Sequence, residues 1–150
     1  MITLILITLA AILNAAMDTI SFRYSRSIFN KYPKWKQFLD VKVSWKNKYK
    51  NRDEKQGRKF FGSTTFLVWL TDGWHLFKCA MLLCFCTAAV FYKPMTDPLL
   101  DIFICYVWFG AVFEIFFGTL FAKGELDKKW IKLKEKIISS IKYIRKGLVP

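Results

Sequence analysis

Six polar or ionisable residues interrupt long apolar stretches of the chain, and their types could support proton transfer or metal binding. The six are Asn14, Asp18, Asp72, His75, Lys78 and Glu114. Residues three or four apart share one face of a helix, so Asn14 lies beside Asp18, and Asp72 beside His75. Carboxylates and an imidazole together can bind a divalent metal ion or perform acid–base chemistry. The candidate metal ligands are Asp18, Asp72, His75 and Glu114; the sequence does not identify the metal.

The stretches that carry these residues are long enough to cross a membrane. A bilayer core of about 30 Å takes roughly 20 apolar helical residues. Three stretches qualify, at about 2–22, 64–92 and 99–121, and Pro94 and Pro98 break the chain between the last two. Of the 150 residues, 54% are hydrophobic, which excludes a disordered chain and disfavours an ordinary soluble domain. We therefore predict an all-α integral membrane protein, with three transmembrane helices in a single membrane domain over residues 1–150.

Positive charge is concentrated between and after these stretches. Residues 23–63 hold 13 Lys and Arg against three acidic residues, and residues 123–150 hold nine against three. Cytoplasmic loops of membrane proteins carry the excess of Lys and Arg. We expect a multi-pass protein of the inner cell membrane, with the N-terminus outside and with the loop 23–63 and the tail 123–150 in the cytoplasm. The first stretch has no positive segment before it and is expected to remain as an uncleaved span.

The loop of residues 23–63, which we call the basic loop, combines cations with aromatic residues. Trp35, Phe38, Val41, Trp45 and Tyr49 recur every three or four residues, which predicts one face of an amphipathic helix. Residues 41–46 also alternate with the period of a short strand. The tail repeats its apolar residues at helical spacing as well, so we predict basic, amphipathic cytoplasmic helices in both segments.

Basic residues interleaved with aromatics suit the headgroup layer of an anionic membrane. We predict that anionic inner-leaflet lipids bind to eight basic residues of the loop, which are Lys34, Lys36, Lys42, Lys46, Lys48, Lys50, Arg58 and Lys59. Nucleic-acid binding is the other function of such a patch. We expect no nucleic acid, because the chain is already tethered to a membrane whose inner face attracts cations.

Three functions remain open for the six polar residues. Counted at about 1.5 Å per residue, they lie roughly 6–12 Å or more from the cytoplasmic ends of the expected spans, so they can meet in one cluster. The cluster can hold the helices together by hydrogen bonds. It can form a proton or cation path that is completed in a homo-oligomer, for which Gly110, Ala111 and Gly118 allow close helix approach. It can also be the site of a membrane-embedded enzyme that acts on inner-leaflet headgroups through Asp, His and Glu.

The sequence contains no recognisable active-site motif. A phosphate-binding loop, a dinucleotide-binding loop, a zinc-protease helix and a serine nucleophile elbow are all missing from its 150 residues. We therefore favour a non-catalytic, oligomeric or accessory membrane component over an enzyme.

Five short strings together resemble a group of small polytopic membrane proteins found in bacteria and large viruses. The strings are AMDT at 16–19, SIF at 27–29, SWKNKY at 44–49, GSTT at 62–65 and TDGWHL at 71–76. The resemblance covers residues 14–78, about half of the chain. No activity is established for that group, so the resemblance supplies no catalytic residue. It implies that the basic loop and the polar cluster belong to one unit.

Overall fold

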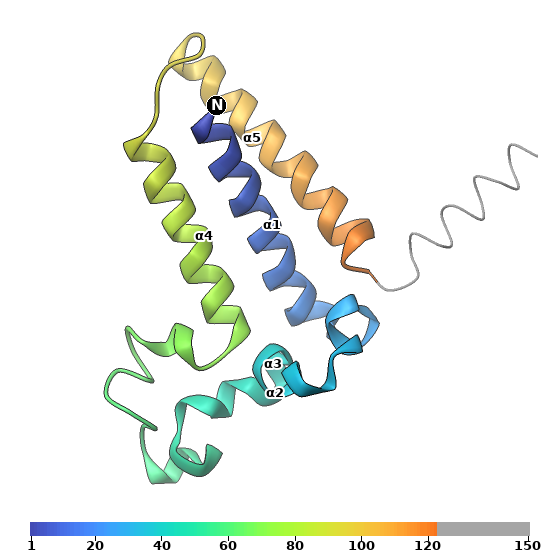
Figure 1. Cartoon of the computed structure of the whole chain (residues 1–150), viewed down its shortest axis with the longest axis vertical. Coiled ribbons are helices and arrows are strands. Elements are labelled where there is room, and N and C mark those ends of the chain that lie inside the picture. Colours follow the sequence, from blue (N-terminus) through green and yellow to red (C-terminus); the bar gives the residue numbers. More distant parts are fainter. Residues whose placement is uncertain (123–150) are drawn as a thin grey trace, which may run out of the picture.

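Three long helices form the body of the molecule (Figure 1). The computed structural model describes residues 1–122. Helices α1 (Ile2–Phe22), α4 (Gly73–Val90) and α5 (Pro98–Ile115) run side by side, and α5 continues through a π-helical turn at Phe116–Leu120. With that turn the helices contain 21, 18 and 23 residues, or about 27–35 Å at 1.5 Å per residue. The sequence prediction of three helices long and apolar enough to cross a membrane is confirmed. The predicted amphipathic tail 123–150 lies outside the described residues.

Helix α1 contacts both other helices through small side chains. Ala10, Ala11, Ala15 and Ala16 are buried, and small residues let helices approach closely. Two further contacts join the bundle. Trp108 of α5 donates a hydrogen bond from Nε1 to Thr8 Oγ1 of α1 at 2.8 Å, and the rings of Phe85 (α4) and Phe109 (α5) lie 5.8 Å apart.

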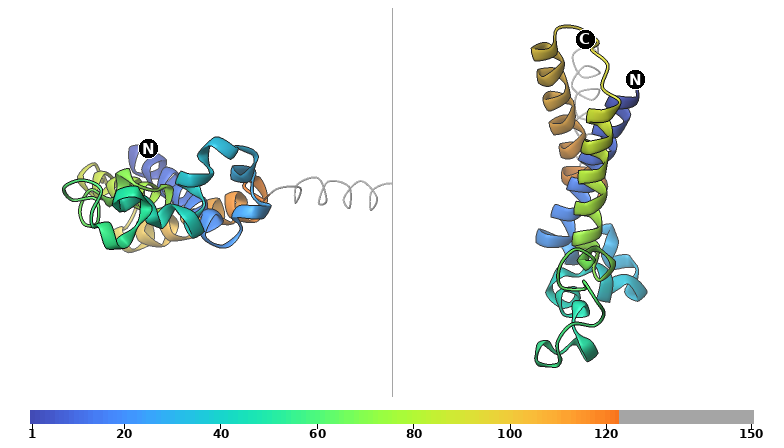
Figure 2. Two further views of the ribbon diagram at one scale, coloured as in Figure 1. Left: turned by 90° about the horizontal axis from the view of Figure 1, so that it is seen from below. Right: turned by 90° about the vertical axis from the view of Figure 1, so that its left-hand side faces the viewer.

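The bundle has two chemically different ends. The N-terminus and the turn at 91–97 lie at one end, and residues 23–72 lie at the other end, which we call the base (Figures 1 and 2). Asp101 stabilises the turn end. Its fully buried carboxylate accepts hydrogen bonds from the backbone N–H groups of Met95 and Thr96, at 2.8 and 3.0 Å, and from the Tyr92 hydroxyl at 2.8 Å.

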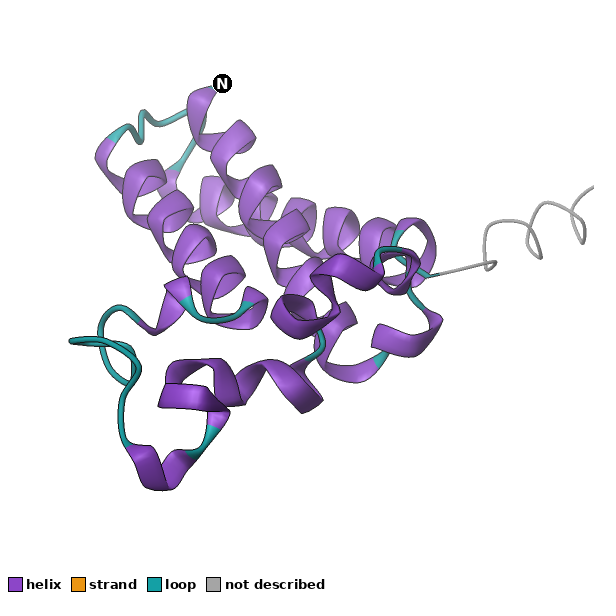
Figure 3. Ribbon diagram, turned by 60° about the horizontal axis from the view of Figure 1, so that its bottom comes forward, coloured by secondary structure: helices purple, strands orange, loops and turns teal. Residues whose placement is uncertain are grey.

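At the base the chain folds into short helical turns (Figure 3). They are η1 (Tyr24–Arg26), η2 (Ile28–Lys31), η3 (Pro33–Trp35), α2 (Lys36–Leu39), α3 (Val41–Ser44), η4 (Trp45–Lys48), η5 (Lys50–Arg52), η6 (Glu54–Gln56) and η7 (Val68–Leu70). Within residues 1–122 there is no β-strand, only two isolated bridges, Ser27 with Ala122 and Tyr49 with Arg58. The described chain is thus all-helical.

The continuous amphipathic helix predicted from Trp35 to Tyr49 is wrong. The backbone of Asp40 is extended (φ −77°, ψ 104°), and its carboxylate accepts a hydrogen bond from the Lys42 N–H at 3.1 Å. An Asp that caps a new helix in this way must itself lie outside helical geometry, so α2 and α3 are separate turns. The strand that residues 41–46 could have formed is replaced by α3 and η4.

The second long helix begins nine residues later than the predicted start at 64, because α4 starts at Gly73. Residues 61–67 form turns that include Gly62 at a positive φ of 80°, a conformation that suits glycine. Asp72 then caps α4, since its carboxylate accepts a hydrogen bond from the His75 N–H at 3.0 Å. Asp72 therefore lies at the helix boundary, not about 12 Å inside a span as counted from residue 64.

Candidate functional site

A buried polar arrangement lies where α4 meets the base. The Asp72 carboxylate is almost fully buried, and one of its oxygens lies 2.8 Å from Nδ1 of His75. The same carboxylate caps the helix, so the imidazole is oriented by a group that the helix start also requires. The His75 side chain remains 34% exposed. A buried carboxylate that holds Nδ1 leaves Nε2 as the ring nitrogen available to an outside partner.

Two hydrogen bonds from one side chain attach the basic loop to this helix start. Nδ2 of Asn47 donates to the backbone oxygens of Gln37, at 2.6 Å, and Thr71, at 3.0 Å. Thr71 directly precedes Asp72, so Asn47 positions the Asp72–His75 pair relative to α2. Asn47 was not among the site residues predicted from the sequence; the one signal for it was its place in the SWKNKY string.

Two further contacts close the base around α4. Ser63, which is fully buried, donates its hydroxyl hydrogen bond to the Lys48 backbone oxygen at 2.8 Å. Gly73 packs so closely on α2 that a Cβ there would lie 2.7 Å from Leu39 Cδ2 and 3.3 Å from the Phe38 backbone oxygen. The strings SWKNKY, GSTT and TDGWHL therefore meet in one place, which we call the α4 junction, defined by Asn47, Ser63, Asp72, Gly73 and His75.

The other four members of the predicted polar cluster are not hydrogen-bonded to this pair. Lys78 places its ammonium 4.9 Å from the centre of the Trp74 ring. Glu114 is exposed on α5, and its carboxylate runs alongside Gly118 of the same helix. Asn14 and Asp18 are half-buried on α1 and make no side-chain hydrogen bond to another part of residues 1–122.

The four candidate metal ligands are Asp18, Asp72, His75 and Glu114. Among the described residues, no three His, Cys, Asp or Glu side chains are grouped as ligands of one ion. Of the four, the structure joins Asp72 and His75 alone by a hydrogen bond. The Asp72–His75 pair suits proton transfer at Nε2 better than metal binding, because metal sites usually need at least three protein ligands.

The predicted headgroup-binding cations lie on the surface of the base. Seven of the eight are exposed and Lys48 is half-buried. Within residues 1–122 none of the eight forms a salt bridge with a carboxylate, so their charge is not neutralised locally. Lys46 and Lys48 lie over the rings of Trp45 and Tyr49, at 5.5 and 5.4 Å. Lys46 and Lys59 line two separate surface depressions of about 580 and 440 Å³.

Comparison of the chain with protein-family models, curated proteins and solved structures gives no match. The features that bear on function are therefore a bundle of apolar helices, a cationic base, and one oriented carboxylate–imidazole pair where the two meet.

Proposed function

We propose that this protein is a three-span integral membrane protein whose basic loop binds anionic lipid on the cytoplasmic face, and that it acts as a non-catalytic accessory component of the membrane. The main observation behind the proposal is that the apolar surface and the cationic surface lie on different parts of the molecule. The outer faces of α4 and α5 expose large apolar side chains, including Leu82, Leu83, Ile102, Phe103 and Val107. The cations of residues 23–63 all lie at the base.

The apolar surface needs a non-aqueous environment. Soluble monomers rarely expose contiguous apolar patches beyond a few hundred Å², whereas lipid-facing helices expose such residues along their whole length. The helices are about as long as the bilayer core is thick. Helices α1 and α5 run in the same direction and α4 runs opposite to them, which puts the N-terminus and the turn 91–97 on one side of the membrane and the base on the other.

The charge of the base sets both orientation and lipid preference. Its 13 Lys and Arg against three acidic residues favour the cytoplasmic side. Each cation near an anionic leaflet contributes about 1 kcal/mol of attraction. Aromatic residues such as Trp35 and Trp45, both exposed, suit the interfacial layer beside those cations.

Topology and lipid binding can be tested together on the full chain. Single cysteines at residues 55 and 95, in a variant that lacks Cys79, Cys84, Cys86 and Cys105, should react with a membrane-impermeant thiol reagent from opposite sides of sealed vesicles. Capture of anionic vesicles by the base of the protein, reconstituted in zwitterionic nanodiscs, should weaken as salt is added. Labelling of residue 95 from the cytoplasmic side would contradict the topology, and vesicle capture that is independent of salt would contradict the electrostatic account.

We also propose that the protein forms a homo-oligomer through α5. Gly110, Glu114 and Gly118 follow each other at intervals of four residues, which places them on one helix face. A Cβ at Gly110 would meet no atom within 4 Å, and Glu114 is exposed. An exposed carboxylate in a lipid-facing helix is costly, and a second copy on this face would cover it. Native mass spectrometry in detergent should give oligomers that Gly110→Leu disrupts; a purely monomeric wild-type protein would contradict this part. A proton or cation path receives less support, because Asp72 and His75 alone among the six polar residues are linked to each other.

An enzyme that acts on lipid headgroups is the second candidate, and one observation favours it. The Asp72–His75 pair has the geometry of a general base whose carboxylate orients the imidazole. If the pair is catalytic, Asp72→Asn, which keeps a capping side chain, should abolish turnover while the protein still folds. Comparison of the lipids of cells that express the wild type, Asp72→Asn or His75→Gln would decide the matter. Identical lipid profiles would leave the pair a structural role at the α4 junction.

A further inference from the structure

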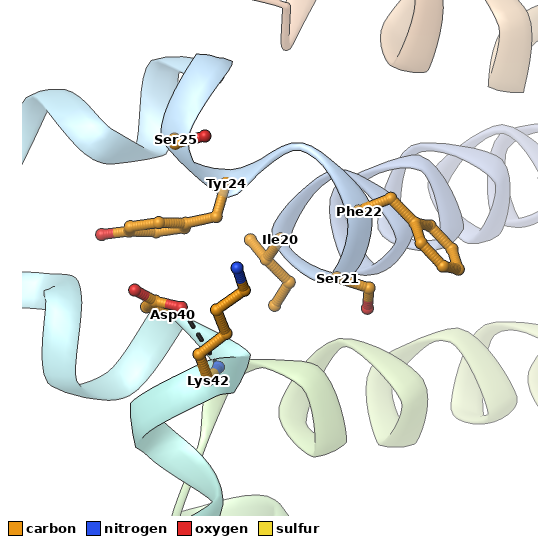
Figure 4. Close-up of a pocket in the computed structure, with 7 residues that line it drawn as sticks. All are labelled: Ile20, Ser21, Phe22, Tyr24, Ser25, Asp40 and Lys42. Carbon is orange, nitrogen blue, oxygen red and sulfur yellow. Dashed lines mark hydrogen bonds between the residues drawn. The ribbon is translucent and has the colours of Figure 1, made fainter.

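A small cavity lies at the base, where the end of α1 meets α3 (Figure 4). Its volume is about 110 Å³, and it is lined by Asp40 and Lys42 on one side and, on the other, by Ile20, Ser21, Phe22, Tyr24 and Ser25. Since one water occupies about 30 Å³ in the liquid, the cavity has the volume of about three or four waters. Five of its seven lining residues have polar side chains: two serines, a tyrosine, an aspartate and a lysine.

The phenol in this cavity has no partner. Tyr24 is 9% exposed, and its Oη is buried without a hydrogen bond to any of residues 1–122. A buried hydroxyl that makes no hydrogen bond is destabilising, and native structures leave few such groups unsatisfied. Burial, and then the negative charge of Asp40, raise the pKa of Tyr24, so the hydroxyl keeps its proton and can donate it. Tyr24 thus adds to the cavity wall a donor that no group within residues 1–122 uses, and the buried hydroxyl would turn toward the cavity to meet a ligand.

The two charged side chains of the cavity are not paired with each other. Asp40 accepts the backbone N–H of Lys42, but within residues 1–122 the Lys42 ammonium forms no salt bridge with Asp40 or with another carboxylate. Figure 4 shows the Asp40 carboxylate below the Tyr24 ring, while the Lys42 side chain extends from α3 toward Ile20. A simple anion would be repelled by Asp40, and a simple cation would be repelled by Lys42. A ligand with one charge of each sign satisfies both.

The place of the cavity suggests where such a ligand comes from. Ile20, Ser21 and Phe22 are at the end of α1, the level at which a spanning helix meets the lipid headgroups. Phe22 is 77% exposed beside the cavity, so an apolar surface continues from the polar cavity toward the outside of the bundle. A headgroup can therefore enter the cavity while its acyl chains stay along the helix.

We infer that this cavity binds the phosphoethanolamine headgroup of a phospholipid, with the phosphate held by Lys42 and the Tyr24 hydroxyl and the ammonium held by Asp40. The inference depends on the proposed insertion of α1 in a membrane. A primary ammonium has three N–H donors for the Asp40 carboxylate, whereas the quaternary ammonium of phosphocholine has none. An anionic phosphoglycerol headgroup would leave Asp40 without a partner.

The test uses the full-length protein in detergent, with phosphatidylethanolamine, phosphatidylcholine or phosphatidylglycerol added and the retained lipid measured by native mass spectrometry. We expect phosphatidylethanolamine to bind about tenfold more tightly than phosphatidylcholine, the change that corresponds to one hydrogen bond to a charged group. Asp40→Asn should remove most of the preference for phosphatidylethanolamine. Lys42→Ala should lower the amount of lipid retained, because the lipid phosphate loses its cationic partner. Equal binding of the ethanolamine and choline lipids would overturn the inference.

Tyr24→Phe tests lipid binding without destabilising the protein. Because the lost hydroxyl has no protein partner, the lipid-free variant should be at least as stable as the wild type, yet it should bind the ethanolamine lipid about tenfold more weakly. Tyr32→Phe and Lys93→Ala, which change exposed residues outside the cavity, should bind as the wild type does. Unchanged lipid binding by Tyr24→Phe would show a water-filled cavity and overturn the inference.

Two further experiments show which part of the inference is wrong if the lipid-binding test fails. Free O-phosphoethanolamine that competes as strongly as the lipid would show a soluble ligand and overturn the lipid assignment. Carbonate extraction of the membrane fraction tests insertion separately. A protein that resists extraction but shows no headgroup preference contradicts this inference alone, whereas a protein that is extracted contradicts the proposed function first.

Discussion

The helix bundle and the base use different contacts to hold their parts together. In the bundle, α1 packs on its neighbours through alanines, and the Trp108–Thr8 hydrogen bond joins α1 to α5. At the base, polar side chains bond to backbone oxygens across long sequence separations, as Asn47 does to Thr71 and Ser63 to Lys48. Apolar packing is not directional, whereas each hydrogen bond fixes a distance and an angle.

This difference indicates where the chain tolerates change. An apolar helix face can exchange one hydrophobic residue for another of similar volume at little cost. The α4 junction cannot, because Asn47 and Asp72 each satisfy specific backbone groups. Three of the five strings singled out in the sequence, SWKNKY, GSTT and TDGWHL, meet at this junction.

The largest effect should come from filling the space at Gly73. Gly73→Val should lower the free energy of unfolding by about 3 kcal/mol, at the upper end of the range for overpacked sites, because even a Cβ would lie 2.7 Å from Leu39 and 3.3 Å from a backbone oxygen. Denaturant unfolding of the detergent-solubilised protein, followed by circular dichroism, measures the change. Gly73→Ala should give a smaller loss of the same sign.

Gly110→Val is the matched control in the bundle, since a Cβ at Gly110 meets no atom within 4 Å. Its stability in a monomeric state should stay within about 0.5 kcal/mol of the wild type. Equal effects at Gly73 and Gly110 would mean that the close contact between α2 and α4 does not contribute to stability, and the contrast between base and bundle would be lost.

A smaller effect is expected for the side chain that ties the loop to α4. Asn47→Ala removes two hydrogen bonds and should cost about 1–2 kcal/mol of folding free energy. Asn30→Ala removes one exposed bond, from Nδ2 of Asn30 to the Ser25 oxygen at 3.2 Å, and serves as the control with little expected loss. Proteolysis of the basic loop under native conditions should accelerate in Asn47→Ala, and unchanged protection would show that the loop is held in place by other contacts.

The sequence predicted the bundle better than the base, for a physical reason. Long apolar runs are a local property, so the helices near 2–22 and 99–121 were found with nearly the observed ends. The start of α4 depends on the Asp72 cap and on the turn at Gly62, while residues 64–70 are themselves mostly apolar. Hydropathy alone could not exclude those residues from the helix.

The polar residues were harder to place, because the fate of a polar side chain depends on partners far along the chain. The Asp72–His75 pair could be predicted, since a spacing of three puts both on one face. The burial of Asp101 could not, although the Asp-Pro pair at 97–98 marks a helix start and an acidic first turn is favourable there. Likewise, the period of the aromatic residues in the basic loop suggested one helix, and the capping role of Asp40 divides it.

The side-chain hydrogen bond within the bundle should contribute less than those of the junction. Thr8→Val keeps the shape of the side chain and removes the acceptor of the Trp108 N–H. Interhelical hydrogen bonds in membranes contribute about 0.6 kcal/mol on average, so the loss of stability should be near that value. A loss as large as that of Asn47→Ala would show that the bundle also depends on directional contacts.

The smallest effect is a change in alkaline stability at Tyr24. The pKa of Tyr24 is raised by burial and by the charge of Asp40, so folding favours the neutral phenol. The associated stability is fully present below the unfolded-state pKa of about 10 and is lost as the pH rises through the higher folded-state pKa. Tyr24→Phe should therefore lose stability less steeply above pH ~10 than the wild type, in unfolding measured over a series of alkaline buffers.

Tyr49 and Tyr92, whose pKa values are also raised, are retained in both proteins and contribute equally, while Tyr32→Phe controls for loss of an exposed phenol. If the stability of the wild type and of Tyr24→Phe falls in parallel as the pH rises, the Tyr24 hydroxyl is solvated. Tyr24 would then belong to the hydrated base and not to the dry bundle.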